Sequence, residues 1–127
     1  MSLLLDSHVL LWWLDGTPSL LASTHRAIEH AADEVLVSAA SIWELEVKRL
    51  KGKLVAPSDI VDRVEQLGFR LVDLTADHAL EAARLPPHHR DPFDRFLVAQ
   101  AQAEAATLVT DDETLAAYDV PTIRARG

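Results

Sequence analysis

Four acidic residues stand out because of where they occur along the sequence: Asp6, Glu44, Asp94 and Asp112. Each follows a short apolar segment or belongs to the first turns of an expected helix. If the fold brings them together, their carboxylates repel one another and hold protons more tightly unless a cation compensates the charge. A divalent metal ion would remove that conflict, and carboxylate oxygens are the ligands that Mg²⁺ and Mn²⁺ prefer. The predicted chemistry is therefore metal-assisted hydrolysis.

The elements that must position these acids follow from the apolar pattern. Short apolar runs predict strands at 3–5, 34–38, 69–74, 107–110 and 120–123. Helical patterns are expected at 9–14, 19–32, 39–50, 60–67, 75–85, 92–101 and 112–118. Strands that alternate with helices predict an α/β fold with a mainly parallel sheet of four to five strands. In such a fold the carboxyl ends of the strands and the first turns of the helices share one edge, and we expect the acids to meet there.

Each acid also has a structural explanation when it is considered alone. Ser41 and Glu44 have the spacing of a capping box, in which two side chains close the first turn of a helix. Asp94 stands at the start of the helix that Asp91 and Pro92 are expected to open, where an acid complements the helix dipole. The acids after the fourth expected strand can do the same for the next helix. Only the joint placement of all of them favours a metal site.

Composition limits how this chain contacts nucleic acid. The formal net charge of −8 argues against a protein that grips nucleic acid over its whole surface. A local basic patch of Lys48, Arg49, Lys51 and Lys53 is able to hold phosphates, or else only complements the end of a helix dipole. The 127 residues, 49% of them hydrophobic, suffice for one ordinary core. We therefore expect a single domain spanning residues 1–127.

Features that the sequence lacks narrow the class of protein further. No cysteine occurs, which removes disulfides and thiolate zinc sites and fits a reducing cytosol. The N-terminal apolar run meets Asp6 before it reaches the length of a signal peptide or a membrane span, so a complete, soluble, cytoplasmic chain is expected. A nucleophile elbow, a Walker loop and a dinucleotide fingerprint are absent. His88 and His89 have no partner pair at zinc spacing and are expected at the surface.

Four segments together resemble the PIN-domain family, and more narrowly its VapC-type toxins. These segments are residues 4–8, 41–45, 90–101 and 108–112, and they run in this order from the first expected core strand to the last. The Asp-Pro-Phe-Asp-Arg sequence within the third segment is the most specific of them.

The resemblance implies a three-layer α/β/α domain with an acidic pocket that binds Mg²⁺ or Mn²⁺ and hydrolyses RNA phosphodiester bonds. Asp6, Glu44 and Asp94 match the three central acids of the family. Asp112 matches the acid that follows the last core strand, and Thr110 matches the hydroxyl residue of that motif.

Two placements within this resemblance stay open. Asp111, Asp112 and Glu113 are consecutive. If the match to the family motif is shifted by one residue, the role of the fourth acid passes to Asp111 or Glu113. Asp91 is expected to cap a helix, with contact to the metal ligands as the alternative.

The resemblance also implies partners. VapC-type toxins are usually homodimers that a small VapB-type antitoxin neutralises by obstructing the acidic pocket. The expected partners are thus an RNA substrate, an antitoxin and a second copy of the chain, with no membrane and with DNA contacted only through the antitoxin. Trp12, Trp13 and Trp43 are candidates for these contacts, and ordinary core packing is the alternative, favoured for Trp13.

Two other functions remain as alternatives. A receiver-like module would bind magnesium and accept phosphate on one aspartate, but such modules usually have paired acids after the first strand and a lysine near the last. Here Asp6 stands alone and no lysine follows Lys53. A PIN-like protein that only binds partners is the second alternative, and the presence of all four acids speaks against it.

Overall fold

The computed structural model describes residues 2–16, 20–31, 34–88 and 91–126. Its centre is a sheet of five strands that all run parallel, in the order β3-β2-β1-β4-β5. The strands are β1 (Leu3–Leu5), β2 (Val35–Ser38), β3 (Arg70–Val72), β4 (Thr107–Thr110) and β5 (Thr122–Arg124). The expected α/β fold with a parallel sheet is confirmed.

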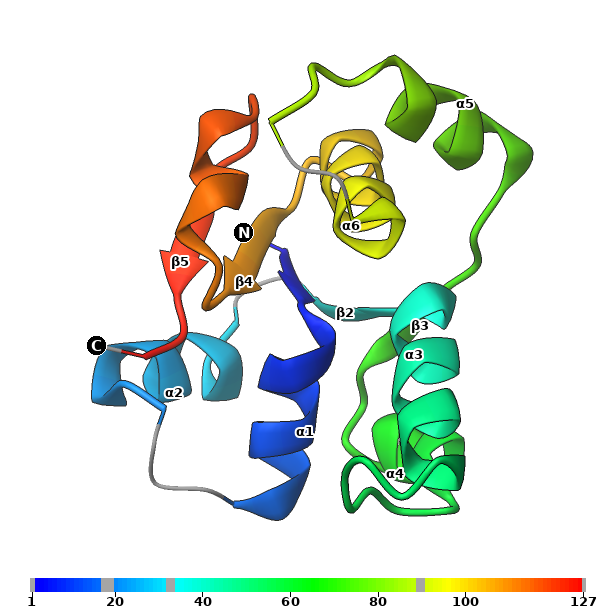
Figure 1. The fold of residues 1–127 in the computed structure, drawn as a ribbon. Helices are drawn as coiled ribbons and strands as arrows, with labels where there is room; N and C mark the ends of the chain where they lie inside the picture. Colours follow the sequence, from blue (N-terminus) through cyan, green and yellow to red (C-terminus); the bar gives the residue numbers. More distant parts are fainter. Residues whose placement is uncertain (1, 17–19, 32–33, 89–90, 127) are drawn as a thin grey trace.

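Helices cover both faces of this sheet (Figure 1). They are α1 (Ser7–Asp15), α2 (Ala22–Glu29), α3 (Ala39–Leu50), α4 (Ile60–Gln66), α5 (Ala76–Arg84), α6 (Pro92–Ala103) and the 3-10 helix η1 (Glu113–Ala117). Because successive strand residues point to opposite faces, Leu3 and Leu5 pack into one core with α1 to α4, whereas Leu4 packs into a second core with α6 and η1. The expected three layers are thus present. No helix within the described ranges is long and apolar enough to cross a membrane.

The order of the strands reverses once. From β1 the sheet grows outward through β2 to β3, and β4 is then added on the other side of β1. Ligands of open α/β sheets bind beyond the carboxyl ends of the strands at such a reversal, which here lies between β1 and β4. A receiver domain has the order 2-1-3-4-5. The observed order therefore excludes the receiver-like alternative.

The expected caps of α5 and α6 are confirmed. Thr75 Oγ1 accepts a hydrogen bond from the His78 backbone N–H at 3.1 Å and begins α5. Asp91 Oδ1 accepts one from the Phe93 backbone N–H at 2.9 Å and begins α6. Proline follows directly as the first residue of α6, where its missing N–H is not needed.

The capping-box explanation of Glu44 is wrong. Helix α3 begins at Ala39, and its cap is Ser38, whose Oγ accepts from the Ala40 backbone N–H at 3.0 Å. Ser41 is buried, and its hydroxyl has no partner among the described residues. The start of α3 therefore does not use the Glu44 carboxylate.

Some elements differ in extent from the prediction. Strand β5 occupies 122–124 rather than 120–123, because the Val120 side chain is buried in the core beside α6 instead of belonging to the paired strand. The last short helix is a 3-10 helix. Helix α2 is shorter than the predicted 19–32, and residues 19 and 32 themselves lie outside the described residues.

Candidate active site

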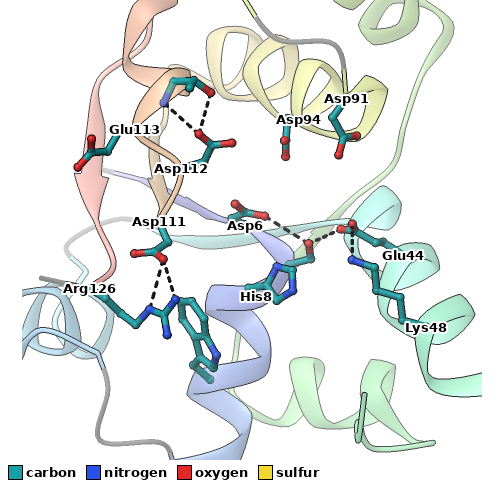
Figure 2. A pocket seen from close by; sticks show the side chains of 13 residues that line it. Asp6, His8, Glu44, Lys48, Asp91, Asp94, Asp111, Asp112, Glu113 and Arg126 are labelled. Carbon is teal, nitrogen blue, oxygen red and sulfur yellow. Dashed lines mark hydrogen bonds and ion pairs between the residues drawn. The ribbon is translucent and has the colours of Figure 1, made fainter. Parts of the chain in front are cut away.

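An acidic pocket of about 640 Å³ lies beyond the ends of β1 and β4, at the reversal of the strand order (Figure 2). All four acids predicted from the sequence line it: Asp6, Glu44, Asp94 and Asp112. The other lining residues are Ser7, His8, Trp12, Lys48, Asp91, Asp111, Glu113, Thr114 and Arg126. Four separate elements of the fold therefore bring the predicted acids to one place.

Asp6 directly follows β1 and stands at the start of α1. Its carboxylate does not form the side-chain cap of that helix. Instead, Oδ2 accepts a hydrogen bond from Thr110 Oγ1 at 2.8 Å, and the Asp6 backbone N–H donates to the Val109 carbonyl at 2.9 Å. Asp6 is thus anchored to β4, and its carboxylate is directed to the pocket rather than used as a helix cap.

A buried hydroxyl links Asp6 to Glu44. Ser7 is 1% exposed, and its Oγ donates a hydrogen bond to Glu44 Oε1 and lies 3.3 Å from Asp6 Oδ1. On the other side, Lys48 Nζ pairs with Glu44 Oε2 at 3.2 Å from the next turn of α3. These contacts hold the two carboxylates near each other although Asp6 lies between β1 and α1 and Glu44 lies in α3.

The start of α6 contributes two further acids. Asp91 and Asp94 both project from this helix end into the pocket (Figure 2). Asp91 is engaged as the helix cap, whereas Asp94 lies in the first turn of α6. The start of α6 therefore supplies both a helix cap, Asp91, and an acid of the pocket, Asp94.

The consecutive acids after β4 have different surroundings. Asp111 Oδ2 accepts from Arg126 Nη2 at 2.8 Å. Glu113 is exposed and forms an ion pair with Arg124 of β5. Both outer acids of the triplet are therefore paired with arginines of the C-terminal segment.

Asp112 occupies the middle position of that triplet. Its Oδ1 accepts from the backbone N–H and the hydroxyl of Thr114, at 3.0 and 2.7 Å, and so caps η1. Its backbone N–H donates to Thr110 Oγ1 at 3.1 Å. In Figure 2 its carboxylate lies on the side of the pocket that faces Asp94. Of the three candidates, this geometry favours Asp112 as the fourth pocket acid.

Burial raises the pKa of Asp6 above its ordinary value of 3.8. Loss of hydration is the largest cause, and the nearby charge of Glu44 acts in the same direction. The hydrogen bond from the Thr110 hydroxyl lowers the pKa but does not cancel the effect of burial. The fold thus disfavours a negative charge on Asp6 until a cation compensates it.

The donor set of the pocket fits Mg²⁺ or Mn²⁺. The lining side chains offer mostly carboxylate oxygens, and the chain has no thiolate to offer. The raised pKa of Asp6 indicates a carboxylate whose charge is incompletely compensated by protein groups. Among the described residues, no three acidic or imidazole side chains converge closely enough to form a ligand cluster by themselves.

The predicted basic patch does not act as one surface. Lys48 lines the acidic pocket, whereas Arg49 forms an ion pair with Glu46 of the same helix. Lys51 and Lys53 are exposed beyond the end of α3. Of the four residues of the predicted patch, only Lys48 is placed to contact a ligand in the pocket.

Arg126 is a pocket residue that the sequence did not reveal. Its guanidinium lies 4.0 Å from the ring centroid of Trp12 and pairs with Asp111. Both partners are remote from it in the sequence, so no local pattern marks this arginine. Trp12 itself is half buried and also lines the pocket.

The other two tryptophans occupy different environments. Trp13 is half buried against the core beneath α1, with its ring near His25 and Phe69. Trp43 is 55% exposed and stacks on Phe93, with ring centroids 5.2 Å apart. Core packing therefore describes Trp13, whereas Trp43 presents aromatic surface to the outside.

The histidine pair before α6 is expected at the surface. His88 is indeed exposed, and its ring meets Tyr118 edge-on. His89 lies outside the described residues.

The fold and the pocket together define a class: a parallel α/β domain with a pocket lined by carboxylates at the reversal of its strand order. The chain belongs to the PIN domain family, which matches residues 3–121. It is similar to Ribonuclease VapC22 from Mycobacterium tuberculosis, with 34% identity over 123 residues that cover 94% of each chain. The resemblance noted from the sequence motifs is thereby confirmed.

Solved structures share the fold at low sequence identity. VapBC2 from Rickettsia felis, bound to a DNA fragment from its promoter, has a TM-score of 0.70 at 15% identity and covers 98% of this chain and 99% of its own. FitAcB from Neisseria gonorrhoeae has a TM-score of 0.69 at 22% identity and covers 96% of each chain. These likenesses establish the architecture.

Proposed function

We propose that this protein is a divalent-metal-dependent endoribonuclease and the toxin of a toxin–antitoxin pair, formed by one PIN domain over residues 1–127. The proposed metal-binding and catalytic residues are Asp6, Glu44, Asp94 and Asp112, with Mg²⁺ or Mn²⁺ as the cofactor. Membership of the PIN domain family and 34% identity to a protein named a ribonuclease support this proposal. The observation that carries it is the convergence of these four acids in one pocket at the strand-order reversal.

The pocket residues have different roles in the proposed reaction. When bound, Mg²⁺ or Mn²⁺ supplies Lewis acidity for the phosphate and lowers the pKa of water. In our proposal Asp6 and Asp94 hold the metal, while Glu44 and Asp112 complete its coordination or orient the attacking water. By resemblance to the family, we propose that the attacking water displaces the 3′ oxygen, which leaves a 5′-phosphate and a 3′-hydroxyl on the products.

Two hydroxyls hold carboxylates of the proposed site in place. Ser7 donates to Glu44, and Thr110 donates to Asp6. Both hydroxyl residues are buried, so their hydrogen bonds are shielded from competition with water. Prior orientation of the ligands reduces the reorganisation required when metal and substrate bind.

Cleavage of total cellular RNA by the purified protein tests the proposal. With Mg²⁺ or Mn²⁺ we expect discrete fragments with 5′-phosphate ends, and with EDTA none. Asp94→Asn should lower the rate by about 10³-fold, the order of loss when an electrostatic group of an active site is removed. Asp77→Asn is the matched control, because Asp77 also stands in the first turn of a helix, is exposed, and does not line the pocket.

Three results would contradict the proposal. They are intact RNA at all metal concentrations, cleavage that persists in EDTA, and equal cleavage by the Asp94→Asn and Asp77→Asn variants. The first would favour the alternative of a PIN-like protein that only binds partners. The other two would move the chemistry away from the acidic pocket.

The proposed partners are a VapB-type antitoxin and a second copy of the chain. The crystallised VapBC and FitAcB proteins support the first of these. Trp43 offers exposed aromatic surface close to the start of α6, where its ring stacks on Phe93. We propose no membrane partner, and DNA contact only through the antitoxin. We place the activity in the cytoplasm, where cellular RNA is found.

A further inference from the structure

We propose that Arg126 binds a backbone phosphate of the RNA next to the scissile one, and that Lys48 binds a phosphate on the opposite side. This inference rests on the proposed nuclease function and names the residues by which the same pocket receives its substrate. Neither residue belongs to the metal-binding set.

The backbone that carries Arg126 is held on several sides. The preceding residue, Ala125, is fully buried, and its N–H donates to the Thr110 carbonyl at 3.0 Å. The Ala125 carbonyl accepts from the Leu21 N–H at 2.9 Å. The carbonyl of Arg126 itself accepts from Arg124 Nε at 2.9 Å. The segment after β5 thus has a defined path that directs Arg126 to the pocket.

The guanidinium of Arg126 is fixed by two contacts of different kinds. Asp111 Oδ2 accepts from Nη2 at 2.8 Å and from Nε at 3.3 Å. The ring of Trp12 lies against the group at 4.0 Å, a cation–π contact. Holding a flexible side chain in this way removes much of the entropy that binding a ligand would otherwise cost.

Donors of Arg126 remain for a ligand. A guanidinium has five N–H donors, and one carboxylate oxygen engages only two of its nitrogens here. Within the ranges that the structure describes, Nη1 makes no hydrogen bond, and the side chain is 42% exposed. Arginine suits phosphate because its fork of donors matches the phosphate oxygens.

The charge balance of the pocket makes its cations important. Seven carboxylates line it: Asp6, Glu44, Asp91, Asp94, Asp111, Asp112 and Glu113. Among the described lining residues, only Lys48 and Arg126 carry a permanent positive charge. RNA brings a negative charge with every phosphate. In the proposed reaction metal ions compensate the charge of the scissile phosphate. The neighbouring phosphates of the RNA need other cationic partners.

The two cations are arranged in the same way at opposite ends of the pocket. Each is anchored by a pocket acid, Lys48 by Glu44 at 3.2 Å and Arg126 by Asp111 at 2.8 Å. Figure 2 shows them on either side of His8, below the carboxylates. A single RNA strand that crosses the pocket between them would bring the scissile phosphate to the acids and a flanking phosphate to each cation.

The salt dependence of RNA binding tests this arrangement. The probe is a fluorescein-labelled 12-nucleotide single-stranded RNA of mixed sequence, titrated at 50–300 mM KCl with Mg²⁺. All variants carry Asp94→Asn so that the RNA stays intact. For single strands, each lost phosphate contact reduces the slope of log K against log [salt] by about 0.7. We expect this change for Arg126→Gln and for Lys48→Gln, and about twice the change for the double variant.

The matched control is Arg63→Gln. Arg63 is the same residue type on α4, it also pairs with an acid, Asp59, at 3.1 Å, and neither residue lines the acidic pocket. The same charge is lost, so only position distinguishes the two variants. Arg126→Lys is the second test variant. It keeps the charge, so it should keep the salt slope, and it serves as the test if Arg126→Gln folds poorly.

In the chain that retains Asp94, Arg126→Gln should raise the KM for RNA cleavage about fivefold with kcat nearly unchanged. Equal salt slopes and equal KM values for Arg126→Gln and Arg63→Gln would overturn the inference while RNA cleavage by the parent chain upholds the nuclease. An Arg126-dependent slope without any cleavage would support the inference and contradict the proposed catalysis. No RNA binding at 50 mM KCl by the chain with Arg126 and Lys48 intact would overturn the inference.

Discussion

The hydroxyl of Thr110 donates to the carboxylate of Asp6 at 2.8 Å across 104 positions of the sequence. The same hydroxyl oxygen accepts from the Asp112 backbone N–H at 3.1 Å. One buried side chain at the end of β4 therefore contacts both the first and the last of the four pocket acids. Because its hydrogen bond lowers the pKa of Asp6, Thr110 counteracts the effect of burial on that carboxylate.

Replacement of Thr110 by valine should raise the pKa of Asp6 further, since the variant loses the hydrogen bond to the ionised form. A metal binds the ionised carboxylate, so binding should begin at higher pH. We expect the increase in Tm caused by Mn²⁺ to appear at higher pH than in the parent chain, and cleavage at pH 6 to fall about tenfold. Thr110→Ser keeps the donor and is the control. Superimposable pH profiles for the valine variant and the parent chain would show that this hydrogen bond does not govern Asp6.

Asp6→Asn should abolish cleavage and stabilise the metal-free fold. The pKa of Asp6 is raised, so the folded chain holds its proton to higher pH than the unfolded chain does. The stabilisation from protonated Asp6 is thus complete below the ordinary value of 3.8 and is lost as the pH rises through the raised value. At neutral pH the ionised group destabilises the fold, and asparagine removes that charge.

Thermal unfolding in EDTA at pH 7 measures this effect. We expect Asp6→Asn to raise the Tm by about 3 °C, the shift that roughly 1 kcal/mol produces in a domain of this size. The gain should shrink as the pH is lowered toward 4. A Tm below that of the parent chain at pH 7 would mean that the carboxylate contributes net favourable contacts to the apo fold.

Arg95 stabilises the fold, although it belongs to the Asp-Pro-Phe-Asp-Arg sequence at the start of α6. Its Nη2 donates to the carbonyls of Ala82 and Leu85, at 2.8 and 2.9 Å, at the end of α5. Arg95→Leu removes both hydrogen bonds, and the Ala82 carbonyl then keeps only the long one from the Leu85 N–H at 3.4 Å. We expect a loss of about 2 kcal/mol in the free energy of unfolding. Urea denaturation measures this loss, and Arg84→Leu, at an exposed site, is the control with little effect.

The rate of RNA cleavage per folded molecule separates stability from catalysis in this variant. Arg95 does not line the acidic pocket. We therefore expect Arg95→Leu to keep the cleavage rate of the parent chain within about twofold once the folded fraction is accounted for. A much larger loss with the fold intact would show that the arginine acts on the substrate or on Asp94.

Ala105 adopts a left-handed backbone conformation, with φ of 51°, in the turn between α6 and β4. This conformation costs a non-glycine residue roughly 1–2 kcal/mol. The greater chain entropy of glycine in the unfolded state offsets part of any gain, by about 0.5–1 kcal/mol. Ala105→Gly should therefore raise the free energy of unfolding by about 0.5 kcal/mol. Ala103→Gly, at the last residue of α6, should lower it by less than about 1 kcal/mol, and both changes are measurable by urea denaturation.

The sequence predicted the parts of the fold that short segments determine. Apolar runs such as 3–5 and 107–110 are strands, and hydroxyl or acidic caps such as Thr75 and Asp91 begin helices. Because parallel strands share a carboxyl edge, the meeting of Asp6 with Asp112 also followed from the strand and helix pattern. Convergence in one pocket is thus a property that topology makes predictable.

Contacts between remote segments were not predictable in this way. The Arg126 contacts with Trp12 and Asp111 depend on the exact path of the chain after β5. The start of β5 was misplaced because Val120 has the composition of a strand residue but packs into the core beside α6. Ser41 was considered as a cap because its spacing to Glu44 is suitable, whereas the earlier hydroxyl of Ser38 takes that position.

The position of β4 beside β1 has a consequence for the timing of synthesis. β1 is made first, but the residues that complete its pocket follow β4, near the end of the described chain. While a ribosome is still translating the segment before residue 107, Asp6 has neither the Thr110 hydroxyl nor the Asp112 carboxylate beside it. A nascent chain of the proposed nuclease therefore cannot assemble this site, and the messenger and ribosome that produce it are exposed to the activity only after nearly all of the domain has been made.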